Sequence, residues 1–173
     1  MLLTLLVLAV CAYASDVRRD LEGSLIRLHI IAESDSDYDQ SVKLAVRDAI
    51  LNATKDIDKS DTDAFLSAAA AAANSYLTAH DVPYRAYAEY GEFDFPEKEY
   101  DGFTLPAGKY RGVRVILGSG SGHNWWCILY PPLCFDGNKD ALRSGLNTDT
   151  YELISTKNSS REVKFRLLEI LGI

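Results

Sequence analysis

The sequence predicts a single α/β domain with two layers, in which a small mixed or antiparallel sheet packs against two to three helices. Short segments rich in branched and aromatic residues alternate between apolar and polar positions, which is typical of half-buried strands. Longer segments repeat apolar residues at intervals of three and four, which is typical of amphipathic helices. The chain has 173 residues, and this length suits one domain with its own core.

Residues 1–14 are typical of a secretory signal peptide. The segment is almost entirely apolar as far as its tenth residue, and Ala12 and Ala14 then supply the small residues that a signal peptidase reads. Cleavage would leave Ser15 as the N-terminus. The charges that begin at Asp16 come too early for the roughly 20 apolar residues that span a bilayer. We therefore expect this segment to be removed, with its retention as an anchor or the attachment of a lipid as the alternatives.

The remaining chain, residues 15–173, is expected to form one extracytoplasmic domain that binds neither nucleic acid nor metal. The sequence holds 18 Lys plus Arg against 25 Asp plus Glu, a net charge of −7. It has no basic stripe that would neutralise a phosphate backbone. The close pair Cys127 and Cys134 is more typical of a disulfide in an exported protein than of a metal site, because two thiols alone make a poor zinc site. We expect no cofactor.

The first half of the domain predicts one strand followed by two helices. Residues 25–32 favour a strand with Arg27 and His29 on one face. A capping-box pattern opens a predicted helix over about residues 37–52. A second helix is expected over about residues 61–79, because this segment contains a run of six alanines, the strongest helix former.

The second half predicts strands of the same sheet, joined by turns and loops. We expect these strands at residues 84–90, 110–117 and 126–130. The stretch between the first two is rich in loop signals, with room for a short strand at 103–105. After residue 136 the sequence is uninformative until a periodic apolar segment predicts a terminal helix at 163–170.

Two motifs that suggest ion binding have simpler explanations. Asp35, Asp37 and Asp39 have the first spacings of a calcium loop, but the glycine and glutamate that such a loop needs are absent, and helix capping explains these aspartates. The glycine-rich run at residues 118–122 lacks the helix and lysine that follow a phosphate cradle, so a turn between strands explains it.

Catalysis is the alternative class of function. A histidine would have to activate one of the two cysteines, but a cysteine held in a disulfide cannot be a nucleophile. Carboxylate pairs, for which Glu89 or Glu92 with Asp94 are candidates, would have to line a cleft, as in an exported hydrolase acting on peptidoglycan or septal wall polymer. No other catalytic motif is present in the sequence.

Residues 123–135 form the most distinctive stretch, because both tryptophans of the chain lie in it. Neighbouring side chains of a strand point to opposite faces, so we expect one of Trp125 and Trp126 to enter the core and the other to face outward beside Asn124. An exposed tryptophan indicates a contact site. Two prolines would then bend the chain back, so that the second cysteine reaches the first and closes a small loop.

Four segments resemble the stage II sporulation protein R family. In chain order they are LIRLHIIA at residues 25–32, VKLAVRDAIL at 42–51, YDGFTLPAGKY at 100–110 and NWWCILYPPLCF at 124–135. The resemblance covers residues 25–135. The tail at 136–173 contributes nothing to it, and Glu33 stands where the family pattern has asparagine.

The resemblance implies a signalling protein of endospore-forming bacteria rather than an enzyme. Such a protein is made in the forespore and exported into the space between the two membranes that separate it from the mother cell. There it is expected to act on a membrane-embedded aspartic protease, which cleaves the precursor of mother-cell sigma factor E. A structural protein of the spore envelope is a further alternative.

The partner-binding residues that we expect lie on two neighbouring strands. Asn124, Trp125 and Trp126, with the loop closed by the two cysteines, are the main candidates, because tryptophan is enriched among binding hot spots. Arg27 and His29 are expected to add a polar patch beside them.

Overall fold

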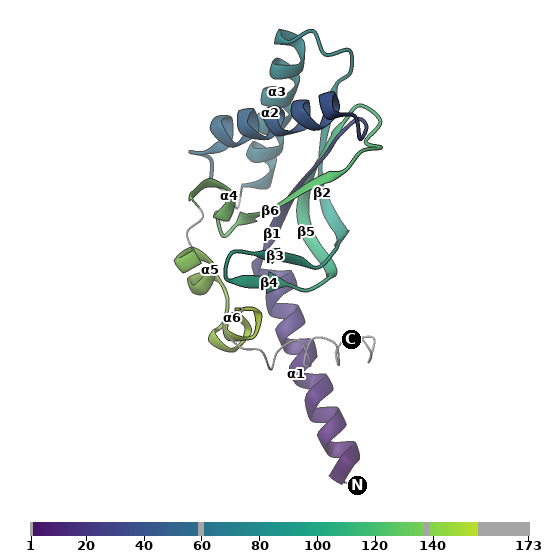
Figure 1. Cartoon of the computed structure of the whole chain (residues 1–173). Helices are drawn as coiled ribbons and strands as arrows, with labels where there is room; N and C mark the ends of the chain where they lie inside the picture. The colour runs from purple at the N-terminus through teal and green to yellow at the C-terminus, as the bar shows by residue number, and fades with distance from the viewer. Residues whose placement is uncertain (1, 59–60, 137–138, 156–173) are drawn as a thin grey trace.

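A computed structural model describes residues 2–58, 61–136 and 139–155 of the chain. It is a mixed α/β domain built on a four-stranded sheet with the order β2-β5-β1-β6 (Figure 1). The strands are β1 (Ile26–Ile31), β2 (Ala86–Phe95), β5 (Gly108–Leu117) and β6 (Asn124–Tyr130). Strand β1 is parallel to β5, and the other pairs are antiparallel. The predicted fold class is therefore confirmed, and its sheet is mixed.

Helices α2 (Asp37–Thr54) and α3 (Thr62–Ala79) cover one face of this sheet (Figure 1). Helix α2 begins one residue earlier than the predicted cap implied, because the hydroxyl of Ser36 accepts the backbone N–H of Asp39. Two alanines of the run, Ala69 and Ala73, are fully buried, and their small size lets α3 approach the sheet closely. This first core contains the apolar residues Leu28, Ile30, Val46, Phe65, Val113, Val115 and Leu129.

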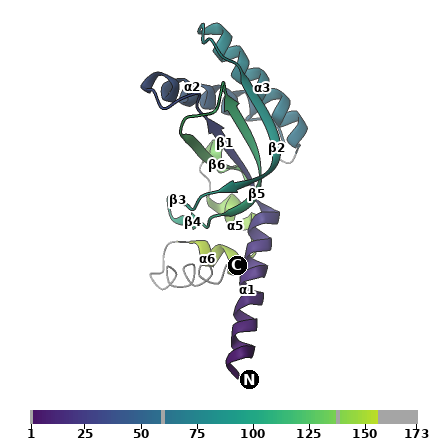
Figure 2. The same cartoon turned by 90° about the vertical axis from the view of Figure 1, so that its right-hand side faces the viewer.

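A second core fills the opposite face at the other end of the sheet. It is covered by the hairpin of β3 (Lys98–Tyr100) and β4 (Phe103–Leu105), by α1 (Leu2–Ser24), and by the short helices α5 (Lys139–Gly145) and α6 (Thr148–Ile154) (Figure 2). Its buried members include Leu21, Leu25, Phe95, Phe103, Leu105, Tyr110, Ile128 and Leu142. A further short helix, α4 (Leu133–Asp136), follows β6.

Helix α1 has an outer part and an inner part with different surroundings. The outer part exposes apolar side chains, of which Leu8 is 64% exposed, and Figure 2 shows it projecting away from the domain. The inner part packs on the second core through Ala14, Val17 and Leu21. Within the described residues, no helix combines the length and the apolar character that crossing a membrane requires. Burial thus starts at the residue after which we expect cleavage.

The predicted strands and helices of residues 25–130 are present, with two differences. Strand β2 extends to Phe95, and β3 occupies part of the stretch that was expected to be loop. The short strand at 103–105 is confirmed as β4. Sequence patterns missed α5 and α6, and the terminal helix predicted at 163–170 lies outside the described residues.

Candidate functional site

The two tryptophans lie on opposite faces of β6, as the alternation predicted, but both are half-buried. Trp125 packs against the first core, with the guanidinium carbon of Arg47 5.3 Å from its ring centroid. Trp126 lies on the other face, stacked on His29 with ring centroids 4.6 Å apart. The expectation of one buried and one outward tryptophan is therefore wrong, because each face of β6 has neighbours that cover part of a ring.

Asn124 is exposed at the start of β6, and contacts from α2 and from the segment that precedes α2 fix the chain just before Asn124. The ammonium group of Lys43 donates to the carbonyl oxygen of His123 over 2.8 Å, and Asp35 accepts the backbone N–H of His123 over 2.6 Å. Lys43 is almost fully buried, and this burial lowers its pKa, which nearby Asp35 partly counteracts. Strand β6 carries both tryptophans and is called the tryptophan strand. It is thus anchored to α2 at its exposed end.

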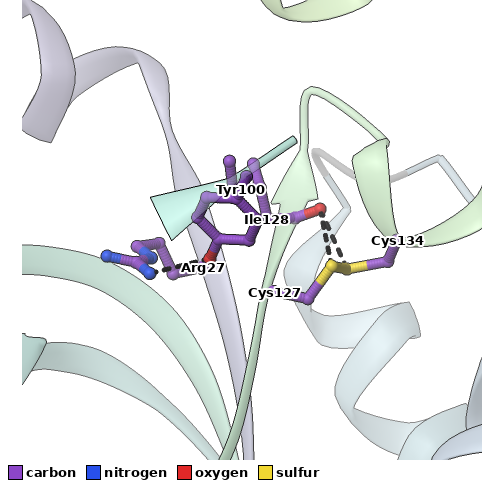
Figure 3. Close-up of a disulfide and its surroundings, with 5 residues drawn as sticks. All are labelled: Arg27, Tyr100, Cys127, Ile128 and Cys134. Carbon is purple, nitrogen blue, oxygen red and sulfur yellow. Dashed lines mark hydrogen bonds between the residues drawn. A yellow bond between two sulfur atoms is a disulfide. The ribbon is translucent and has the colours of Figure 1, made fainter. Parts of the chain in front are cut away.

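The predicted disulfide between Cys127 and Cys134 is present, with Cα atoms 5.9 Å apart. It ties α4 back to β6, and the sulfur of Cys134 lies 2.9 Å from the carbonyl oxygen of Ile128 (Figure 3). The loop between the two cysteines contains the predicted proline bend after Tyr130. The disulfide therefore holds the end of β6 that lies opposite to Asn124.

Arg27 shares one face of β1 with His29, as predicted, but its side chain is fully buried rather than exposed. Its guanidinium carbon lies 4.4 Å from the ring centroid of Phe95 and 5.1 Å from that of Tyr110. Its Nη2 donates to the hydroxyl of Tyr100 over 2.9 Å (Figure 3), whereas its Nε and Nη1 have no hydrogen-bond partner. Aromatic side chains from distant strands cover this part of the sheet, so the expected exposed polar patch is absent.

His29 is also buried, between the rings of Trp126, Phe93 and Phe95. Neither of its ring nitrogens has a hydrogen-bond partner. Burial lowers its pKa to about 3, and the positive charges of Arg114 and Arg27 act in the same direction. The imidazole is therefore neutral at physiological pH.

The carboxylates considered for catalysis do not form one cluster. Glu89 forms an ion pair with Arg114 on the face of β2 that also carries Phe93. Glu92 and Asp94 point to the opposite face, because their positions in the strand have the other parity, and both are exposed. Glu89 and Asp94 therefore cannot act together on one substrate.

A cavity of about 340 Å³ lies elsewhere, between α1 and α6. Its wall consists of Tyr13, Asp16, Val17, Asn147, Thr148, Asp149 and Thr150. Tyr13 belongs to the predicted signal peptide, so cleavage after Ala14 would remove part of this wall.

The acidic residues around the start of α2 serve local structure. Asp39 accepts hydrogen bonds from Ser36 and from Tyr84, the latter over 2.7 Å, and no group of three or more metal-ligating side chains occurs among the described residues. Turn residues 118–122 connect β5 to β6, and Gly118 and Gly120 have positive φ values of 55° and 65° there. The turn interpretation is thus confirmed, whereas the cap of α2 is Ser36 and not one of the aspartates.

Together these features define a class of protein. It is a mixed-sheet α/β domain in which a disulfide links β6, the strand with both tryptophans, to the short helix α4. A family model described as stage II sporulation protein R matches residues 22–140, and the chain belongs to this family. Stage II sporulation protein R of Bacillus subtilis (strain 168) is 37% identical over 119 residues, which make up 64% of this chain and 53% of the relative. The chain thus spans about half the length of that curated relative. No solved structure matches the chain.

Proposed function

We propose that this chain is an intercompartmental signal of sporulation. In this proposal it is exported from the forespore into the space between the two membranes, where it activates a membrane-embedded aspartic protease. The active protease then processes the precursor of mother-cell sigma factor E. The observation that carries the proposal is the family match over residues 22–140, which spans every strand of the domain.

Activation by a ligand requires that the ligand bind the active state of its receptor more tightly than the inactive state. A shift from 1:99 to 99:1 needs a difference of about 5.5 kcal/mol in binding free energy. A rigid surface with aromatic groups suits this task, since few conformations are lost on binding. The strand of Asn124, Trp125 and Trp126, held by α2 at one end and by the disulfide at the other, meets this description.

The proposal is tested by co-expressing this chain, the candidate protease and the sigma factor precursor in a host that has none of the three. We expect precursor cleavage when all three are present and none when either this chain or the protease is omitted. Cleavage that is independent of this chain would overturn the proposal. Degradation of purified peptidoglycan by the chain alone would favour the exported hydrolase instead.

Trp125→Ala tests the contact surface in the same assay. We expect processing to fall by roughly thirty-fold, because truncating a hot-spot tryptophan removes about 2 kcal/mol of binding free energy. Tyr87→Ala is the matched control, since Tyr87 is 61% exposed on β2, at the far edge of the sheet. Equal processing by both folded variants would exclude Trp125 from the contact.

A further inference from the structure

Arg27 carries a buried positive charge that no acidic group neutralises in the described part of the chain. Its side chain is fully buried, and the ion pairs among the described residues all involve other groups. An arginine stays charged in the protein interior, so it cannot escape the unfavourable desolvation by losing its proton. A buried charge is normally paired, and this one points to a missing anion.

The groups around Arg27 compensate its charge only in part. The rings of Phe95 and Tyr110 face the guanidinium, and the hydroxyl of Tyr100 accepts one N–H. Cation–π contacts and one neutral acceptor offset part of the desolvation of an ion. Two of the three guanidinium nitrogens still lack an acceptor. Buried N–H groups of this kind are rare in native proteins and call for a partner.

His29 adds a second unpaired donor on the same face of β1. Its ring centroid lies 5.2 Å from that of Phe95, and the Phe95 ring also contacts the guanidinium of Arg27. A neutral imidazole carries one N–H, and neither nitrogen of His29 has a partner. The pair thus offers several N–H donors and one net positive charge, within walls of aromatic rings.

This combination suits a carboxylate. One positive charge balances a single negative charge, and the planar fork of a guanidinium matches the two oxygens of a carboxylate. A phosphate group carries more charge and is tetrahedral, so it fits one cation between flat rings less well.

Tyr100 links Arg27 to the partly exposed hairpin of β3 and β4. It belongs to β3, the outer strand of the two-stranded hairpin, whose other residues Lys98 and Glu99 are exposed. The tyrosine is half-buried, and its hydroxyl holds Nη2 of Arg27.

We propose that Arg27, with His29 beside it and Tyr100 above it, is a receptor site for a carboxylate. The site stands independently of the signalling role. Its assignment to an acidic side chain of the partner rests on the proposed function. A second source of the same chemistry is the chain's own C-terminal segment, which contains Glu162 and Glu169.

Acetate is the probe, added to the full chain against chloride at equal ionic strength. We expect a saturable rise of a few degrees in the unfolding midpoint. In an NMR spectrum of the arginine side chains, the Nε–H signal of Arg27 should shift along the same saturation curve. Arg85 is the internal control, because it is exposed at the start of β2 and its signal should follow bulk salt alone. The absence of a saturable shift at Arg27, in both this titration and the tail variant below, would overturn the site.

Variants test two questions separately, namely whether Arg27 binds a carboxylate and which molecule supplies that carboxylate. Arg27→Met should abolish the acetate response and Arg85→Met should retain it, and the spectrum of the unmodified chain decides the matter if Arg27→Met does not fold.

If the double variant E162Q/E169Q moves the Arg27 signal, the chain supplies its own carboxylate. If acetate binds and Arg27→Met loses sigma factor processing while remaining folded, the partner supplies it. Normal processing by folded Arg27→Met would remove the partner as the source and leave the site intact. A chain that never supports processing would contradict the proposed function alone, because acetate binding is measured without the protease.

Discussion

His29 stays neutral in the folded chain, and the free energy of unfolding should therefore depend on pH. Its pKa is lowered from 6.5 to about 3, mainly by burial. The unfolded chain therefore binds more protons between these two values, and the free energy of unfolding must fall as the pH falls from 6.5 toward 3. We expect a loss of about 1 kcal/mol per pH unit in this window. Denaturant unfolding at a series of pH values measures it.

His29→Phe should remove this slope, because phenylalanine keeps the aromatic packing on Trp126 but does not titrate. His80→Phe is the control, since His80 is exposed. Asp35 and Asp39 affect only the acidic end of this window, so the slope due to His29 is read above about pH 5. Their pKa values are lowered below 3.8 by hydrogen bonds, from the backbone of His123 and from Ser34 respectively, so their contribution to stability is lost at lower pH. An unchanged slope in His29→Phe would contradict the assignment.

At the scale of single residues, the sequence predicts which way a side chain points better than it predicts exposure. The alternation of β1 correctly placed Arg27 and His29 on one face. It also suggested that this face meets solvent, because polar residues usually do. The rings that bury these two residues belong to Phe95, Tyr110 and Trp126, which are distant in sequence, and no local pattern shows that they converge.

The disulfide loop at the end of β6 should contribute measurably to stability. Seven positions separate Cys127 from Cys134, and closing a loop of this size restricts the unfolded chain by about 2 kcal/mol. We expect a reductant to lower the free energy of unfolding by this amount, as measured by denaturant titration. The double variant C127A/C134A should not respond to the reductant. Cys11→Ala should respond as the unmodified chain does, because Cys11 is a free cysteine.

The parallel pair of β1 and β5 depends on a close approach at Gly112. A Cβ atom there would lie 2.8 Å from the backbone oxygen of Arg27 and 3.1 Å from the ring of Phe95. Gly112→Ala should therefore lower the free energy of unfolding by about 1–3 kcal/mol. Gly23→Ala is the matched control with the opposite sign. Nothing lies within 4 Å of a Cβ at Gly23, which is helical, so alanine should stabilise by up to about 1 kcal/mol. Equal effects of the two variants would contradict the close approach.

At the scale of elements, length limits what the sequence can predict, with the three-residue strand β4 as an exception. Helices α2 and α3 contain 18 residues each, enough for several turns of periodic apolar residues, and both were predicted. Helices α5 and α6 contain seven each and β3 contains three, which is too short for a period to be recognised. The tryptophan strand was found because its composition is unusual, not because of its period.

At the scale of the whole molecule, α1 joins an exposed segment to one that packs in the second core. Leu21 is 1% exposed in the second core and Leu8 is 64% exposed. Leu21→Ala should lower the free energy of unfolding by about 2–5 kcal/mol. Leu8→Ala, the matched control, should change it by less than about 0.5 kcal/mol. Comparable losses in both variants would show that the outer part of α1 is packed in solution.

Removal of residues 1–14 should leave the contacts made by the inner part of α1 in place. The backbone N–H of Asn147 binds Asp20 over 3.1 Å, and Arg111 donates to the carbonyl oxygen of Gly23, so β5 and α6 are both attached to the inner part of α1. A chain that begins at Ser15 keeps these contacts. Cleavage after Ala14 stays a prediction from the sequence. The sequence gave no indication that part of residues 15–24 belongs to the core, because a charged helical turn is typical of a surface.

The order of strands in the sheet was not predictable, and it has a consequence for how the chain acquires its structure. Strand β1 is made first, yet it lies in the interior of the sheet, and both of its neighbours, β5 and β6, come from the far end of the matched region. Arg27 pairs with Gly112 on one side and with Ile128 on the other. Contacts between such distant segments form slowly, because a long loop must close before any of them is made. A nascent chain therefore cannot complete the four-stranded sheet until β6, which ends at Tyr130, has been synthesised.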